Sequence, residues 1–157
     1  RLMNIRTMRP DDVDTVSSIC IEAFSKAVAP TLSDEGVCTF KTLAAVDSFA
    51  ARMQEDNVML VFEQAGTVRG VVELKQGRHI AMLFVDPGYQ KHGMGRALMS
   101  AALGYAREDV ITVSASLTSV PAYISYGFEC SGEVSEQGGL VYQPMELKRT
   151  NGRPSVG

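Results

Sequence analysis

The sequence predicts an α/β fold in which a mixed sheet of about six to seven strands is flanked by about four helices. Three observations support this prediction. A short apolar segment, Ile80–Val85, has the length of a buried strand, and a glycine-containing turn follows it. From Met94 to Tyr105 the apolar residues recur every three or four positions, which is typical of one face of a helix. A β-branched segment, Val110–Ser116, comes next, and strands joined through a helix are expected to be parallel neighbours.

The first half of the chain is predicted to contain a strand, several helices and a hairpin. Pro10 ends the opening strand and, with the acidic residues after it, suits the first turn of a helix. The turn Ala65–Gly66 separates two apolar segments that predict a β-hairpin. In chain order we expect a strand at 4–8, a helix from about Pro10 to Lys26, one or two helices within 33–56, and strands at 57–64 and 67–75.

The second half contains the remaining strands and two helices. Pro121 suits the first turn of a short helix, and Gly127 ends it. In chain order we expect a strand at 80–85, a helix from Met94 to about Ala106, a strand at 110–116, a helix at 118–126, and strands at 128–134 and 140–147 across a turn at 135–139. Because no repeat or linker interrupts these segments, residues 3–148 are predicted to form a single domain, with a polar C-terminal tail at 149–157.

Composition limits the classes of function. The chain has 157 residues, 45% hydrophobic and 21% charged, which is typical of a globular protein. A net charge of −3 gives no support for binding to nucleic acid or to an anionic membrane. No apolar run approaches the roughly 20 residues of a membrane span. The three cysteines form no paired motif and the two histidines show no metal-ligand spacing. We therefore expect reduced thiols, a cytoplasmic location and no metal.

The turn before the central helix has the composition of an anion site. It reads Gln90-Lys91-His92-Gly93-Met94-Gly95. Backbone N–H groups at a helix start are unpaired and lie at the positive end of the helix dipole, and glycine lets an anion approach them closely. A nucleotide P-loop requires lysine and then serine or threonine after the last glycine, where this chain has Arg96-Ala97. A dinucleotide fingerprint requires a third glycine, where this chain has Leu98. Both phosphate binders are therefore disfavoured.

This stretch resembles motif A of the GNAT N-acetyltransferases, a superfamily that moves acyl groups from acyl-coenzyme A to amines. That motif is an apolar strand ending V-x-P, then [QR]-x-x-G-x-[GA], then an amphipathic helix. Val85-Asp86-Pro87 and Gln90–Gly95 match it at the right spacing. Tyr123–Phe128 matches the Y-x-x-x-G-F with which a later short helix often ends in the family. The order of predicted elements is similar to the GNAT fold from Asn4 to Leu147.

The resemblance implies an acetyl-coenzyme A-dependent enzyme without a metal. It would acetylate a primary amine by direct attack in a ternary complex, with a small molecule favoured over a protein as acceptor. Dimers are common in the family, which leaves a homodimer open. The rival interpretation is a non-catalytic coenzyme A-binding sensor or partner subunit of the same fold. The family often has a cofactor-contacting asparagine before the tyrosine helix, where this chain offers Ser116 and Ser119. The residues implied in coenzyme A binding are Leu83, Phe84, Val85, Gln90, Lys91, His92, Gly93, Met94, Gly95, Arg96 and Ser119.

Three residues are candidates for proton transfer. Tyr123 is the predicted general acid, because a phenol can protonate the thiolate that leaves when an amine attacks a thioester. The candidate base is His79, which stands where some relatives carry a carboxylate, six residues before the valine of V-x-P. Alternation along the strand would direct His79 to the acceptor side unless a bulge intervenes. Glu73, on the neighbouring strand, is the alternative base.

The acceptor side is expected to be built from the first helices, the loop between them and the last hairpin. These elements would bring in Phe24, the segment Ala27–Phe40 and the loop around Gln137. Asp34 and Glu35 are expected to attract a cationic amine, unless they serve only as acids in the first turn of a helix. The sequence itself does not identify the acceptor.

Overall fold

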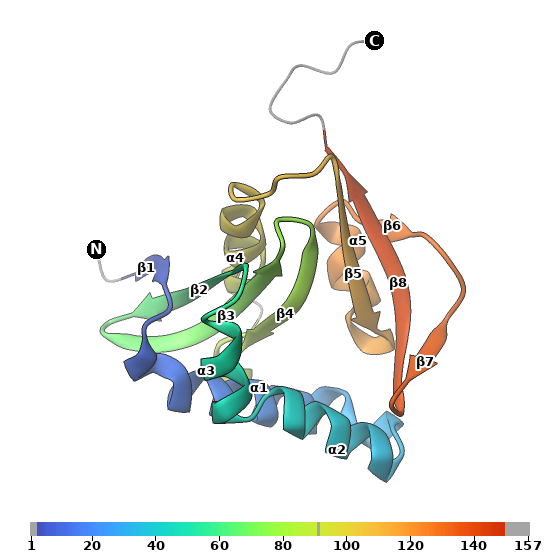
Figure 1. The fold of residues 1–157 in the computed structure, drawn as a ribbon, viewed down its shortest axis with the longest axis horizontal. Helices are drawn as coiled ribbons and strands as arrows, with labels where there is room; N and C mark the ends of the chain where they lie inside the picture. The colour runs from blue at the N-terminus through green and yellow to red at the C-terminus, as the bar shows by residue number, and fades with distance from the viewer. Residues whose placement is uncertain (1–2, 91, 150–157) are drawn as a thin grey trace.

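The structure, a computed structural model, describes residues 3–90 and 92–149 and confirms a mixed α/β fold (Figure 1). Residues 150–157 of the predicted tail lie outside this range. The strands are β1 (Met3–Thr7), β2 (Asn57–Gln64), β3 (Thr67–Lys75), β4 (His79–Val85), β5 (Val110–Ser116), β6 (Glu129–Cys130), β7 (Ser135–Gln137) and β8 (Leu140–Lys148). The α-helices are α1 (Val13–Ala27), α2 (Asp34–Leu43), α3 (Val46–Arg52), α4 (Met94–Leu103) and α5 (Val120–Ser125). The described residues thus hold one strand more than the chain-order prediction, and the segment predicted to form one or two helices forms two, α2 and α3.

Helices cover both faces of the sheet, whose strand order is β1-β2-β3-β4-β5-β8-β6, with β7 also paired to β8. One face packs against α4 and α5 in a core that includes Val72 and Leu98, and the other packs against α1, α2 and α3 in a core that includes Val71 and Phe49. Val71 and Val72 are neighbours in β3 but face opposite cores, because side chains alternate along a strand. Burial on both faces explains why β3 is apolar at successive positions. Among the described helices, none is long and apolar enough to cross a membrane.

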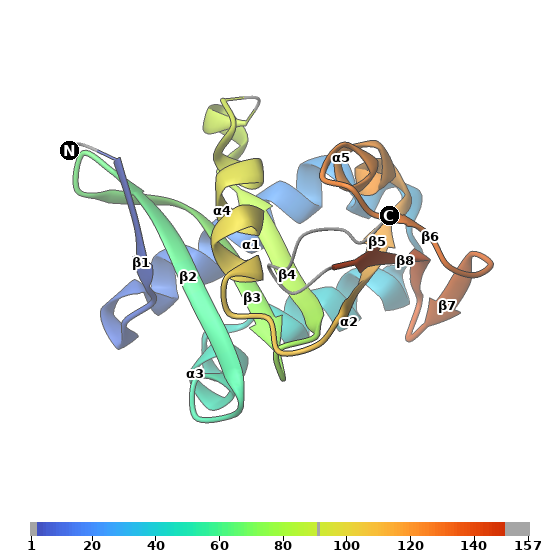
Figure 2. The ribbon, with the colours of Figure 1, turned by 90° about the horizontal axis from the view of Figure 1, so that it is seen from above.

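The expected β2–β3 hairpin and the parallel pairing of β4 with β5 are confirmed. The parallel pairing is short: two residue pairs join the strands, between the first two residues of β4 and Thr112 and Val113 in the middle of β5. A bulge lies in β4 at this point. Leu74 pairs with Ile80 but Glu73 pairs with Met82, so Ala81 has no partner in β3. Beyond the bulge β4 and β5 separate, as Figures 1 and 2 show.

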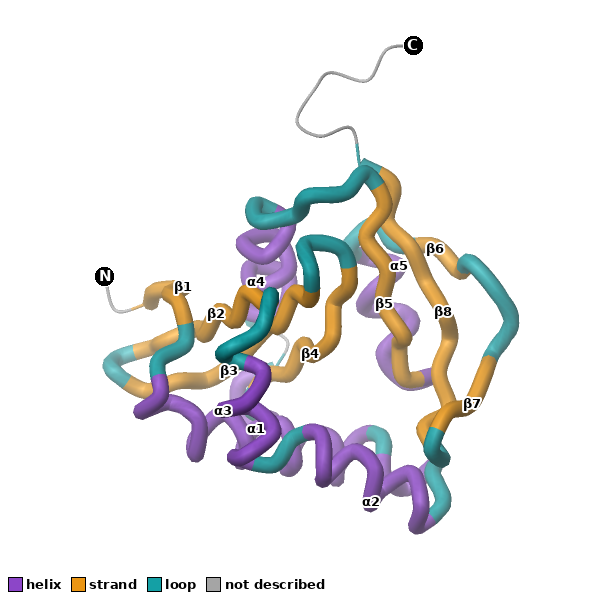
Figure 3. Tube along the Cα trace, in the orientation of Figure 1, coloured by secondary structure: helices purple, strands orange, loops and turns teal. Residues whose placement is uncertain are grey.

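The end of the sheet differs from the prediction of one strand at 128–134. The structure has two short strands, β6 and β7, separated by a loop that runs along β8 (Figure 3). Pro144 in β8 explains the break. Its carbonyl accepts a hydrogen bond from the N–H of Ser131 at 3.0 Å, so its nitrogen faces the same edge and has no proton to donate. The ladder resumes where Ser135 pairs with Tyr142, within the segment predicted as a turn.

The turn between β7 and β8 packs against α2, far from the β4–β5 pairing in Figure 1. The Thr39 hydroxyl donates a hydrogen bond to the carbonyl of Gly138 at 2.6 Å. Gly36 of α2 lies directly against Gly139, and a Cβ on Gly36 would overlap the Gly139 carbonyl. Gly139 also has φ +83°, a left-handed conformation that glycine adopts without strain. The first helices and the last hairpin are therefore joined by a contact that only glycines allow.

Candidate active site

A cleft of about 880 Å³ lies between the separated ends of β4 and β5. Its walls are the second halves of these strands, the starts of α4 and α5, the inner sides of α1 and α2, and the β7–β8 turn. The bulge and the short pairing leave the facing edges of the two strands without a neighbouring strand. Such an edge can pair with an extended ligand. The cleft also lies at the carboxyl ends of parallel strands, where open α/β sheets bind their ligands.

The start of α4 forms one end of the cleft, through Met94 and Gly95. Gly93 precedes the helix with φ +82°, and because it has no side chain it cannot cap the first N–H groups. These groups and the positive end of the helix dipole suit an anion. A Cβ on Gly95 would lie 2.6 Å from the hydroxyl oxygen of Tyr126, so close packing also keeps this position small. Unlike a side-chain-capped helix, α4 leaves its first turn open to a ligand.

Two tyrosines of the α5 region line the same cleft. Tyr123 is buried, and its ring packs edge-on against Tyr126 at 5.8 Å and against Phe128 at 5.5 Å between centroids. Burial raises the pKa of Tyr123 well above its ordinary value, so the hydroxyl stays protonated at neutral pH. Tyr126 is half-buried, and burial raises its pKa as well, against the opposing effect of Arg96.

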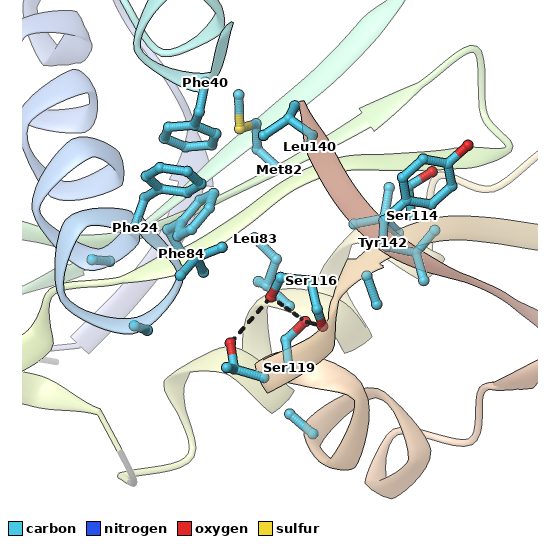
Figure 4. Close-up of a pocket in the computed structure, with 18 of the residues that line it drawn as sticks. Phe24, Phe40, Met82, Leu83, Phe84, Ser114, Ser116, Ser119, Leu140 and Tyr142 are labelled. Atoms are coloured by element: carbon cyan, nitrogen blue, oxygen red, sulfur yellow. Dashed lines mark hydrogen bonds between the residues drawn. The ribbon is translucent and has the colours of Figure 1, made fainter. Parts of the chain in front are cut away.

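A cluster of hydroxyls occupies the cleft where β5 ends (Figure 4). The Ser116 hydroxyl donates to the Ser119 hydroxyl at 2.9 Å, and the Ser119 hydroxyl donates to the Ser116 carbonyl at 2.8 Å. The Thr118 hydroxyl lies 3.4 Å from that of Ser116. This network offers polar groups to a ligand without placing a charge in the cleft.

Residues 28–149 match the family model described as the acetyltransferase (GNAT) domain. The chain belongs to the GNAT acetyltransferase family. It is 26% identical over 129 residues to the uncharacterized N-acetyltransferase YafP of Escherichia coli K12, covering 81% of each chain. Among solved structures, it is similar to a GCN5-related N-acetyltransferase from Rhodopseudomonas palustris (TM-score 0.81, 22% identity, 94% of this chain and 96% of that one). It is also similar to YncA, a putative acetyltransferase from Salmonella typhimurium solved with acetyl-CoA (TM-score 0.73, 21% identity, 100% of each chain).

Most of the predicted coenzyme A-binding residues of this GNAT acetyltransferase line the cleft. They are Leu83, Phe84, Val85, Gln90, Met94, Gly95 and Ser119. Gly93 shapes the helix start without lining the cleft, and His92 and Arg96 are exposed residues outside it. Lys91 lies outside the described residues. Within the described residues, no group of three or more histidine, cysteine or acidic side chains could hold a metal ion.

Neither predicted base of the GNAT site lines the cleft. His79 lies at the paired start of β4, with its Nδ1 atom 2.8 Å from the Thr112 hydroxyl. The bulge at Ala81 breaks the alternation that was expected to direct His79 toward the acceptor. Glu73 is fully buried on the face covered by α3, where its carboxylate accepts a hydrogen bond from Arg52 Nε at 2.8 Å. Because neither side chain lines the cleft, the assignment of either one as the base stays a prediction.

The acceptor side of the cleft is aromatic rather than acidic. Phe24 lines the cleft as expected, whereas Asp34 and Glu35 are exposed in the first turn of α2 and do not line it. The Phe24 and Phe40 rings stack with their centroids 3.9 Å apart, and Phe84 meets Phe40 edge-on at 5.4 Å (Figure 4). From the sequence, Phe40 is expected only as the end of the segment Ala27–Phe40, and nothing in the sequence predicts this stack. Stacking across two helices has no signature in the spacing of either one.

Proposed function

We propose that this GNAT protein transfers the acetyl group of acetyl-coenzyme A to the primary amine of a small molecule, by direct attack while both are bound. The main support is that one cleft combines the open first turn of α4, the free edges of β4 and β5, and the phenol of Tyr123. The acetyl-CoA in the YncA structure supports the choice of cosubstrate. The contact between α2 and the β7–β8 turn favours a small acceptor, because it restricts the entry of an extended polypeptide.

The chain's own groups fit coenzyme A. The backbone N–H groups at the start of α4 are suited to the pyrophosphate, because glycines at positions 93 and 95 keep side chains away from them. The free edge of β4 beyond the bulge can pair with the amide groups of an extended pantetheine arm. The hydroxyls of Ser116 and Ser119 offer further hydrogen bonds near the end of β5.

Acetyl-coenzyme A, when bound, supplies a thioester whose C–S bond breaks as the amine nitrogen bonds to the acetyl carbon. Tyr123 is proposed to donate its hydroxyl proton toward the sulfur as negative charge develops there. The raised pKa ensures that this proton is present at neutral pH. The proton released by the acylated nitrogen restores the phenol, and the products are an acetamide and a thiol.

The positions of the cysteines support direct attack over an acetyl-cysteine intermediate. Cys20 is buried, and burial raises the pKa of its thiol far above the ordinary value. Cys38 and Cys130 are exposed. None of the three lines the cleft, so no thiol is placed to carry the acetyl group.

The proposal is tested by a binding and a turnover measurement on the purified chain. Acetyl-coenzyme A should raise the melting temperature, whereas ATP and NAD should not. A thiol-release assay, corrected for hydrolysis, should then show turnover with at least one amine from a panel of alkylamines, arylamines, polyamines, aminoglycosides, amino acids and peptides. Mass spectrometry should find the acetamide product. Binding of coenzyme A without turnover of any amine would instead favour the non-catalytic sensor, and a melting shift with ATP or NAD alone would contradict the coenzyme A site.

A further inference from the structure

No ionic side chain lines the cleft in the part of the chain that the structure describes. Among the described residues that line it, none has a carboxylate, imidazole, ammonium or guanidinium group, and the polar members are hydroxyls and amides of serine, threonine, tyrosine and glutamine. The acids considered as candidate bases or as attractors of a cationic amine do not line it either. Asp34 and Glu35 are exposed on α2, and Glu73 is fully buried against Arg52. A cationic acceptor would therefore find no carboxylate of these residues beside it.

The acceptor side of the cleft is instead an aromatic surface. Phe24, Phe40 and Phe84 come from α1, α2 and β4, and their rings are in mutual contact. Met82 and Leu140 lie beside them, and both also line the cleft (Figure 4). Phe24 and Phe40 are largely buried in their stack, whereas Phe84 is half-buried and offers part of its ring for a further flat ring to pack against. This side of the cleft suits an apolar, planar molecule better than a hydrated polyamine.

Amines that are neutral at pH 7 and amines that are cations at pH 7 differ in the number of protons they must lose before and during acylation. A neutral amine loses one N–H proton on acylation while the leaving sulfur gains one, so the overall reaction takes up and releases no proton. An alkylammonium must first lose an additional proton, because only the free amine has a lone pair. With a pKa close to the lysine value of about 10.4, only about one such molecule in 10³ is neutral at pH 7. No described lining residue is a base that could take that additional proton, and an apolar cleft disfavours the cation further.

We infer that the acceptor is an aromatic amine, with its nitrogen attached directly to the ring, that is neutral at physiological pH and packs against Phe24, Phe40 and Phe84. This inference rests on the proposed acetyl transfer and names the substrate class of the same site. The aromatic side chains orient the ring, and the uncharged cleft accepts the amine in the form that attacks. Neither His79 nor Glu73 is needed as a base.

Three small amines distinguish the effect of an aromatic ring on turnover from the effect of a positive charge. Aniline is aromatic and neutral at pH 7, benzylamine is aromatic and charged, and cyclohexylamine is aliphatic and charged. The purified chain with saturating acetyl-coenzyme A should give a kcat/KM for aniline at least about tenfold above those of the other two at pH 7, because only about 1 in 10² to 1 in 10³ molecules of each charged amine is free and because the apolar cleft disfavours the cation. The kcat/KM of aniline should stay level as pH rises from neutral, whereas those of the charged amines should rise toward tenfold per pH unit.

A binding measurement tests the aromatic surface without turnover. Acetanilide and N-cyclohexylacetamide are both neutral products and differ only in the ring. Calorimetric titration into the coenzyme A-saturated protein should show tighter binding of acetanilide. Phe40→Leu should weaken acetanilide binding by about 2–10-fold, the range expected for loss of one aromatic contact. An unchanged dissociation constant for coenzyme A would show that this variant keeps its fold.

A second variant changes a residue outside the hydrophobic core. Ser114 of β5 is exposed and lines the cleft, so Ser114→Asp adds a carboxylate there without disturbing packing. It should raise the kcat/KM of benzylamine relative to aniline. A wild-type kcat/KM for benzylamine or cyclohexylamine equal to or above that for aniline would overturn the acceptor class and leave acetyl transfer intact. Bound coenzyme A with no acetylation of any amine in the panel would remove the proposed transfer, and the acceptor class with it.

Discussion

At the scale of single residues, the surroundings of two tyrosines give them different expected roles. Both Tyr123 and Tyr126 line the cleft. Tyr123 is buried, and its pKa is raised because the ionised phenol would lose solvation. Tyr126 directs its hydroxyl against Gly95 and has the Arg96 guanidinium 5.3 Å from its ring centre. Tyr126 therefore supports the start of α4, and Tyr123 is the better donor to a leaving sulfur.

Tyr123→Phe removes the proposed donor and keeps the ring packing. We expect kcat to fall by about 10²-fold, the low end for general acid catalysis, because a raised pKa makes the phenol a weaker acid. The dissociation constant for acetyl-coenzyme A should change little. Tyr126→Phe is the matched control on the same wall and should keep most of its turnover. Steady-state kinetics measure kcat, and a binding titration measures the dissociation constant. Equal falls in kcat for the two variants would contradict the assignment of the general acid to Tyr123.

His79 gives a pH-dependent prediction about stability rather than catalysis. Burial, and then the charges of Lys75 and Arg78, lower its pKa in the fold. The pKa of His79 in the unfolded chain is about 6.5. As pH falls below this value, the unfolded chain binds a proton at His79 before the folded protein does. The free energy of unfolding is therefore unaffected by the titration of His79 above that pH and falls below it. Between about pH 7 and pH 5, the free energy of unfolding should fall less for His79→Gln than for the wild-type protein. Denaturant unfolding at the two pH values measures this difference.

The same His79→Gln variant tests whether the histidine is a base. Because His79 lies outside the cleft, acetyl transfer by the variant should match wild type across the pH profile. A lost ascending limb in kcat/KM would restore His79 to the mechanism.

At the scale of elements, the start of α4 is held open by two glycines for two different reasons. Gly93 needs its left-handed φ of +82°, and nothing lies within 4 Å of the position of its Cβ. Gly95 lacks space, because its Cβ would lie 2.6 Å from the Tyr126 hydroxyl oxygen but 3.8 Å from the ring carbon that carries it. Removal of that hydroxyl would therefore create room for a methyl group.

A double-mutant cycle tests this packing. Gly95→Ala alone should destabilise the fold and weaken coenzyme A binding, because Tyr126 must move. Adding Tyr126→Phe should recover both, with a favourable coupling of about 0.5–1 kcal/mol. Denaturant unfolding of the four proteins in the cycle gives the coupling, and a value near zero would mean that the two groups do not compete for space.

Most elements of the fold were predictable because their signals are local. Helical spacing in α1 and α4 and β-branched content in β5 each lie within a dozen or so residues. The break between β6 and β7 was missed because its cause is Pro144 on another strand, which affects its partner only after the two have paired. A bulge in this strand was allowed for but could not be located for a similar reason, since an extra residue such as Ala81 appears only in the register between strands.

The site was predictable where binding depends on the backbone and unpredictable where it depends on side-chain direction. Met94 and Gly95 at the start of α4 and the end of β4 line the cleft as expected, because glycine spacing indicates where the main chain is accessible. His79 was predicted from its position in the family motif and from strand alternation, and Glu73 from its place on the neighbouring strand. The bulge altered that alternation for His79, and burial against Arg52 removed Glu73. Buried groups find partners that the sequence does not show.

At the scale of the whole molecule, the cleft opens between two parts of the sheet that are joined at each of its ends. The short β4–β5 pairing joins them at one end, and the contact of α2 with the β7–β8 turn joins them at the other (Figure 1). The first contact is made of strand hydrogen bonds, and the second of glycine packing and one hydrogen bond from Thr39. The width of the acceptor side therefore depends on the second contact.

Gly36→Ala should open that contact, because the obstacle is the backbone carbonyl of Gly139, which cannot rotate away as a side chain can. We expect the KM for the amine to rise several-fold and the free energy of unfolding to fall by about 1–3 kcal/mol, the usual cost of overpacking. The dissociation constant for coenzyme A should change little, because its phosphate end is assigned to α4. Gly66→Ala is the matched control: it has φ +82° and no atom within 4 Å of its Cβ, so it should lower stability without altering either constant. An unchanged amine KM in Gly36→Ala would show that this contact does not set the width of the cleft.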